Sequence, residues 1–155
     1  MAMRSTRRAA LALAGFAGMT AAMAGRKAGA DQPGVHRVAI QVSSNDPALM
    51  NMALNNVKNI IEYYKTIGET VEVELVTFGP GLHMLRADRS PVKDRLTSLK
   101  GSLPTLTYSA CENTRNGMIR VEQGEVPMVP EAKLVPSGVV RLMQLQEEGW
   151  SYLRP

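Results

Sequence analysis

Predicted strands and helices alternate from residue 36 to the end of the chain, and this alternation constrains the fold more than any other feature. Short apolar runs indicate the strands, and amphipathic stretches with helical spacing separate them. The strands are expected at residues 36–42, 71–78, 104–110, 133–135 and 150–153, and the helices at 47–67, 82–87, 90–101, part of 112–124, and 138–148. The pattern favours an α/β three-layer sandwich, a mostly parallel sheet with helices on both faces.

Local signals define several of these boundaries. Asp46 is a typical helix cap, Pro47 is favoured at a first helical position, and Gly68 is a typical stop. Ser137 is the predicted cap of the last helix. The helix 47–67 has a wide apolar face, which indicates that it packs against both the sheet and a neighbouring subunit.

Residues 1–30 have the composition of an export signal, so the predicted single domain covers residues 31–155. A basic start with two adjacent arginines precedes an uncharged run of mostly alanine, leucine, glycine and methionine. The arginine pair resembles a twin-arginine signal, and an ordinary secretory signal is the alternative. Small residues predict cleavage after Ala30, with a second candidate after Ala24. We therefore expect a periplasmic or secreted protein.

Hydropathy and charge argue against a membrane span and against nucleic-acid binding. The apolar run of the signal is too short and too rich in alanine and glycine to span a bilayer, so we expect no membrane span. Residues 1–30 hold five of the 18 basic residues and none of the 14 acidic ones, which leaves the remaining chain with a net charge of −1. Its only basic cluster is the stretch 86–95. Because nucleic-acid binding needs a concentrated basic surface, we expect none.

Three polar or glycine-rich loops each follow a predicted strand. They cover residues 43–47, 79–81 and 111–114. Right-handed crossovers place all strand-to-helix loops at one edge of a parallel sheet, so these loops are expected to lie together. Ligands of open α/β sheets bind at this edge.

Cys111 is the only cysteine of the chain, so an internal disulfide is excluded. The sequence places it after a strand and before a helical segment. A helix N-terminus lowers the pKa of a thiol at this position, and Asn113 and Thr114 are candidates for further hydrogen bonds. These features favour a reactive thiol, and a buried, inert cysteine is the alternative.

Four further residues are candidate binding residues on weaker grounds. Gly79 and Gly81 can offer backbone N–H groups to an anion, although a tight turn is the simpler interpretation. Asn56 falls among apolar helix positions, where it must be hydrogen-bonded. We interpret Asn56 as a tie to a loop or a neighbouring subunit, with a ligand contact as the alternative. His83 is a candidate base for a Cys-His pair with Cys111.

The sequence predicts no metal and no cofactor. Two histidines, one cysteine and scattered carboxylates show no metal-ligand spacing. The glycine loop 79–81 lacks the length and the lysine of a phosphate-binding loop. Met50 and Met52 point in different directions on a helix, which suits packing better than copper binding.

Several segments together resemble the DsrE/DsrF-like sulfur-relay family, in its YchN-like branch. They follow one another in order over nearly all of residues 35–155: 36–42 (HRVAIQV), 53–59 (ALNNVKN), 73–81 (VELVTFGPG), 110–114 (ACENT) and 149–153 (GWSYL). The resemblance implies a flavodoxin-related α/β fold and a homo-trimer or homo-hexamer.

The resemblance also implies that Cys111 carries sulfur as a persulfide, with a sulfur-donor or acceptor protein as partner. The leading hypothesis is therefore a sulfur carrier or sulfurtransferase-like protein, in which Asn113, Thr114 and the glycine loop hydrogen-bond the sulfur. The chain departs from the family in its export signal and in Glu112, where a small residue is common. A non-enzymatic oligomeric binding protein and a thiol redox sensor using Cys111 are the alternatives.

Overall fold

Five parallel strands form one sheet in the computed structural model, which describes residues 35–155. The central strands are β1 (Val35–Val42), β2 (Thr70–Thr77) and β3 (Leu106–Cys111). The strand order is β4-β3-β2-β1-β5, so β4 (Ala132–Val135) and β5 (Ser151–Leu153) are the two edges. Every pairing is parallel, which confirms the predicted sheet.

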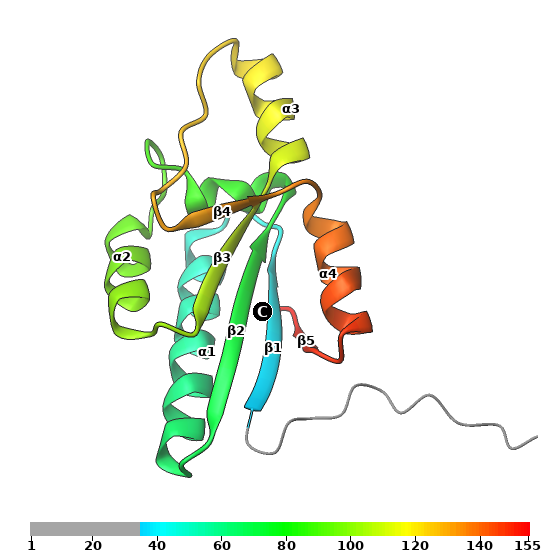
Figure 1. Cartoon of the computed structure of the whole chain (residues 1–155). Coiled ribbons are helices and arrows are strands. Elements are labelled where there is room, and N and C mark those ends of the chain that lie inside the picture. The colour runs from blue at the N-terminus through cyan, green and yellow to red at the C-terminus, as the bar shows by residue number, and fades with distance from the viewer. Residues whose placement is uncertain (1–34) are drawn as a thin grey trace, which may run out of the picture.

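Helices cover both faces of the sheet (Figure 1). α1 (Pro47–Thr66), the 3-10 helix η1 (Gly79–Leu85) and α2 (Lys93–Ser102) pack on one face, and α4 (Gly138–Glu147) packs on the other. α3 (Glu112–Glu122) projects beyond the ends of the strands, and none of its residues is fully buried (Figure 1). The predicted three-layer α/β class is confirmed.

The two faces of the sheet carry cores of different size. On the α1 face, alternate strand residues such as Ile40 and Leu75 pack against a broad set of helix residues that includes Met50 and Leu54. The α4 face holds a much smaller apolar cluster: Ala39, Val76, Phe78, Leu142, Leu145 and Trp150. α4 is therefore attached to the sheet by few apolar contacts.

Several helix ends follow the predicted signals. The Asp46 carboxylate accepts a hydrogen bond from the Ala48 N–H at 2.8 Å and caps α1. Gly68, just after α1, has φ +76, which favours glycine. The Ser137 hydroxyl accepts from the Val140 N–H at 3.5 Å and caps α4. These side chains cap the N-termini of α1 and α4.

Two boundaries differ from the prediction by three residues, more than the others. The glycine turn and the short helix after it form one element, η1, which already begins at Gly79. α2 begins at Lys93, three residues later than predicted. The Ser90 hydroxyl donates to the Met84 carbonyl and accepts from the Val92 N–H, so the residues before Lys93 are fixed as a turn.

Arg86, the first residue of the basic stretch 86–95, has a fully buried side chain. Its guanidinium donates to Asp88 at 2.9 and 2.7 Å and to Glu122 at 2.5 and 3.0 Å. Hydrogen bonds from Arg86 hold the pKa of Asp88 and that of Glu122 below their usual range. The ion pairs join the end of η1 to the last turn of α3.

No helix within residues 35–155 is long and apolar enough to cross a membrane. The predicted signal of residues 1–30 and its cleavage after Ala30 lie outside the described residues.

Candidate functional site

Cys111 is the last residue of β3 and the N-cap residue of α3, at the carboxyl edge of the sheet. It lies on the α4 face of β3, and only 4% of its surface is exposed. The three predicted loops meet here. Gly81 lies against the end of β1, and the Gly79 N–H bonds to Thr114. The loops that follow the parallel strands therefore lie around this thiol.

Two helix N-termini converge on the Cys111 sulfur. Backbone N–H groups of Asn113 and Thr114, in the first turn of α3, lower the pKa of the thiol, and the N–H of Gly138, the first residue of α4, lowers it as well. A Cβ atom on Gly138 would lie 3.3 Å from the Cys111 Cβ and 3.0 Å from the Phe78 Cβ. Glycine at position 138 therefore allows α4 to approach the cysteine closely.

The Thr114 hydroxyl links the sulfur to the glycine loop. It accepts a hydrogen bond from the Gly79 N–H at 3.0 Å, and its own hydrogen bonding lowers the pKa of the Cys111 thiol. A hydroxyl has a single proton, so accepting from Gly79 leaves that proton free to point at the sulfur. Gly79 has φ +53, a conformation that favours glycine. The loop and the hydroxyl together form a relay that ends at the thiol.

Burial raises the pKa of the Cys111 thiol, and hydrogen bonds lower it. The donors are the Thr114 hydroxyl and the backbone N–H groups of Gly138, Thr114 and Asn113. Their combined effect is the larger, so the pKa lies below that of an ordinary cysteine. The thiolate is the nucleophilic form of cysteine. The site can therefore hold a sulfur anion through neutral, pre-oriented donors.

We expect Thr114→Val to raise the pKa of Cys111 by about one unit, because a hydrogen bond to a charged group contributes about 1.5 kcal/mol. Alkylation by iodoacetamide, followed as a function of pH, measures the change. At a pH below the thiol pKa, the rate should fall about tenfold. Thr107→Val is the matched control, because Thr107 precedes Cys111 on β3 and its hydroxyl has no bond to the sulfur. An unchanged pH profile in Thr114→Val would contradict the relay.

Of the predicted binding residues, Asn113 acts on the thiol through its backbone N–H, and Gly81 packs closely against the backbone of β1. The Asn113 side chain is exposed, and its N–H lies 3.3 Å from the Pro136 carbonyl oxygen as well as facing the sulfur. A Cβ atom on Gly81 would lie 2.2 Å from the Val42 carbonyl oxygen. Close backbone packing therefore accounts for glycine at position 81.

The structure does not bring Asn56 and His83 to the thiol. Asn56 is half-buried on α1, on the opposite face of the sheet, and its side chain makes no hydrogen bond with the described residues. His83 lies near Glu122 of α3, whose carboxylate pairs with Arg86, and no hydrogen bond within residues 35–155 joins it to Cys111. In the same part of the chain, no three His, Cys, Asp or Glu side chains are grouped closely enough to hold a metal ion.

The sequence reasoning missed Gly138 and Phe78. A signal for Gly138 was present, because Ser137 caps a helix directly after the predicted strand 133–135. Loops that follow parallel strands share one edge of the sheet, so this loop belonged with the other three. Phe78 follows β2 and packs beneath Gly138, and its apolar character gave no separate signal.

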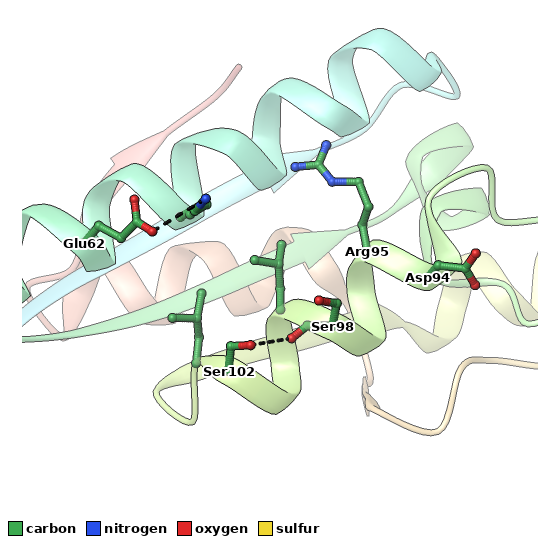
Figure 2. Close-up of a pocket in the computed structure, with 8 residues that line it drawn as sticks. Glu62, Asp94, Arg95, Ser98 and Ser102 are labelled. Carbon is green, nitrogen blue, oxygen red and sulfur yellow. Dashed lines mark hydrogen bonds and ion pairs between the residues drawn. The ribbon is translucent and has the colours of Figure 1, made fainter.

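A groove of about 540 Å³ lies between α1 and α2, on the face of the sheet opposite Cys111 (Figure 2). In Figure 2 Arg95 points toward α1, and Asp94 points away from it. The Arg95 guanidinium donates to the side-chain oxygens of Asn51 and Asn55. The groove is thus formed by the helix pair and is separate from the thiol.

A second groove, of about 470 Å³, lies between β4 and α4 and adjoins the site. Val135, Pro136 and Ser137 form part of its wall, and Lys133 and Arg141 also line it. Val135 is the neighbour of Cys111 in the sheet, and Ser137 precedes Gly138. The segment 135–138 therefore separates this groove from the thiol.

Comparison with known proteins identifies a similar fold and no activity. No family model matches the chain, and no curated protein matches it. The solved structure of a protein of unknown function from Methanobacterium thermoautotrophicum is similar, with 27% sequence identity and a TM-score of 0.65. The match covers 77% of this chain and 99% of that chain. The similarity supports the α/β architecture over nearly all the described residues.

Proposed function

We propose that this chain is a sulfur carrier or sulfurtransferase-like protein that holds sulfane sulfur on Cys111 as a persulfide. The observation that carries the proposal is the convergence of two helix N-termini and the Thr114 hydroxyl on one thiol of lowered pKa. Such an arrangement favours the nucleophilic thiolate. The same neutral donors would stabilise a persulfide anion after the reaction.

The proposed loading step needs no external oxidant or reductant. The Cys111 thiolate attacks the outer sulfur of a donor such as thiosulfate, and a new S–S bond forms. The S–S bond of the donor breaks, and sulfite leaves with its electron pair. The product is a Cys111 persulfide anion, which a second thiolate can take over by attacking the terminal sulfur.

We also propose that the mature chain acts after export, in the periplasm or outside the cell, following cleavage near Ala30. The composition of residues 1–30 supports this. A homo-trimer or homo-hexamer is proposed as the working state. Exposed apolar side chains on one flank of α1, among them Met52, Tyr63 and Ile67, support an interface between subunits. A donor or acceptor protein would exchange sulfur with Cys111.

Intact mass measurement after incubation with thiosulfate or polysulfide tests the proposal. We expect a mass gain of whole sulfur atoms in the wild type that is lost on reduction. Cys111→Ser should show no gain, because it removes the only thiol of the chain. The control Thr107→Val should load like the wild type.

Two results would overturn the carrier function. One is a reactive Cys111 that never gains sulfur from any sulfane-sulfur donor. The other is an oxidant-dependent, reductant-reversible dimer through Cys111 in place of sulfur loading, which would assign redox sensing instead.

A further inference from the structure

A buried ion pair between Glu74 and Arg141 lies near the thiol, on the same α4 face of the sheet. Glu74 of β2 is only 5% exposed, and its two carboxylate oxygens accept from Arg141 of α4 at 2.8 and 2.7 Å. The Ser109 hydroxyl donates to the same carboxylate at 2.6 Å. One carboxylate thus ties a helix to two strands.

The residues that Glu74 binds flank the cysteine site from both sides. Ser109 lies two residues before Cys111 on the same face of β3. Arg141 lies in the first turn of α4, where its N–H donates to the Ser137 carbonyl at 2.9 Å. Gly138 belongs to this same turn, and a Cβ atom on it would lie only 3.3 Å from the Cys111 Cβ. A shift of the turn would therefore move the Gly138 N–H relative to the sulfur.

Apolar packing supports this turn at Gly138, which is buried against Phe78, and at no other residue of the turn. The buried apolar side chains of α4 are Leu142 and Leu145, both beyond the first turn. Val139 and Val140, next to Gly138, are 51% and 48% exposed. Arg141 is thus the side chain of the first turn that is hydrogen-bonded to the sheet.

We propose that Glu74 and Arg141 are positioning residues that hold the first turn of α4 against Cys111, so that the Gly138 N–H reaches the sulfur anion. The inference rests on the proposed function, since the reaction it serves is sulfur loading on Cys111. Neither residue touches the sulfur. They act through the position of the backbone of Gly138.

Other charged groups also face the pair. Glu148 lies 3.8 Å from the Arg141 guanidinium at the far end of α4, and the Lys133 charge acts on Glu74 from β4. Neither provides the two-point geometry of Glu74 and Arg141. A bidentate pair fixes direction as well as distance, which a single contact does not. Arg141→Lys should therefore retain the charge but only part of the positioning.

The test measures the alkylation rate of Cys111 against pH in Glu74→Gln, Arg141→Met and Arg141→Lys. We expect the pH at the midpoint of the alkylation profile to rise by about one unit in Arg141→Met. At a pH below the midpoint, the alkylation rate should then fall about tenfold. In Arg141→Lys the midpoint should rise less. Arg37→Met is the matched control. Arg37 pairs with Glu72 on the same face of the sheet at 3.1 Å, with about half of each side chain exposed.

The amide resonance of Gly138 gives a second readout, which a merely structural role would not move. In the wild type it should shift as Cys111 loses its proton, and in Arg141→Met this shift should disappear. If Arg141→Met does not fold, Glu74→Gln and Arg141→Lys decide the question. Folded variants with wild-type alkylation profiles and a wild-type Gly138 shift would overturn the positioning role.

The outcomes separate this inference from the proposed function. Sulfur loading in the wild type with unshifted profiles in all three variants would overturn the positioning role alone. Shifted profiles in the variants of a protein that takes up no sulfur would support the positioning role and overturn the carrier function.

Discussion

Gly81→Ala is expected to destabilise the fold by about 3 kcal/mol, because overpacking against rigid backbone is costly. A Cβ atom on Gly81 would lie 2.2 Å from the Val42 carbonyl oxygen and 2.8 Å from the Ser43 Cα. Both contacts are with backbone, so no side-chain rotation can relieve them. The new methyl group must push η1 away from the end of β1, and urea unfolding monitored by circular dichroism would measure the loss.

Gly101→Ala is the matched control for this substitution. Gly101 lies in α2, and a Cβ atom there would meet no heavy atom within 4 Å. Alanine in a helix is favoured over glycine by about 0.5–1 kcal/mol, so this variant should unfold at a higher urea concentration. Equal midpoints for Gly81→Ala and the wild type would refute the close approach of η1 to β1.

Arg86→Met is expected to destabilise the protein by about 3 kcal/mol, the lower end of the cost of breaking a buried ion pair. The substitution keeps the apolar length of the side chain but removes the buried cation, so that Asp88 and Glu122 keep only the exposed Arg89 as an ion-pair partner. Both carboxylates are partly exposed, at 34% and 23%, so water can compensate in part. Thermal and urea unfolding at neutral pH would measure the difference.

The cost of Arg86→Met should depend on pH in a defined direction. The pKa values of Asp88 and Glu122 are depressed in the folded state, so their pairing stabilises the fold above the unfolded-state pKa. This stability is lost as the pH falls through the folded-state pKa. The difference in the free energy of unfolding between Arg86→Met and the wild type should therefore become smaller below about pH 4. Arg89→Met, at a 57% exposed side chain of the same cluster, should change stability little at any pH.

The α/β class and most element boundaries could be predicted because their causes are local. Asp46 and Ser137 cap helices through contacts with residues two or three positions away. The parallel sheet follows from the alternation of strand and helix, because parallel strands need a crossover between them. The start of α2 could not be predicted, because the Ser90 hydroxyl bonds to Met84 in the preceding element.

The burial of Arg86 could not be predicted, because its second partner is 36 residues away in sequence. Spacing shows a basic stretch and suggests a solvated surface, whereas the fold brings Glu122 onto the guanidinium. The burial of Asn56 was overestimated for a related reason. A helical wheel gives its direction, but only the neighbouring elements decide how far the core extends.

The sequence predicts the part of the candidate site that comes from β3, α3 and the glycine loop, but not the part that comes from α4. Cys111 and Thr114 are close in sequence, and Gly79 follows a neighbouring strand, so strand order placed them together. Gly138 comes from the next crossover and lies close to Cys111 because β4 is beside β3. Glu74 reads as an alternating surface residue of a strand, and its burial depends on Arg141.

The strand order also bears on how this sheet avoids extension by other chains. Its edges are β4 and β5, with four and three residues, whereas the central strands β1 and β2 have eight each. A short edge exposes few free backbone groups on which a foreign strand can pair. Of the two long, valine-rich strands, β2 is hydrogen-bonded to β1 and β3, and β1 is covered on its outer side by β5 over residues 38–40. In the folded state, the long central strands are therefore largely unavailable for pairing with strands of other chains.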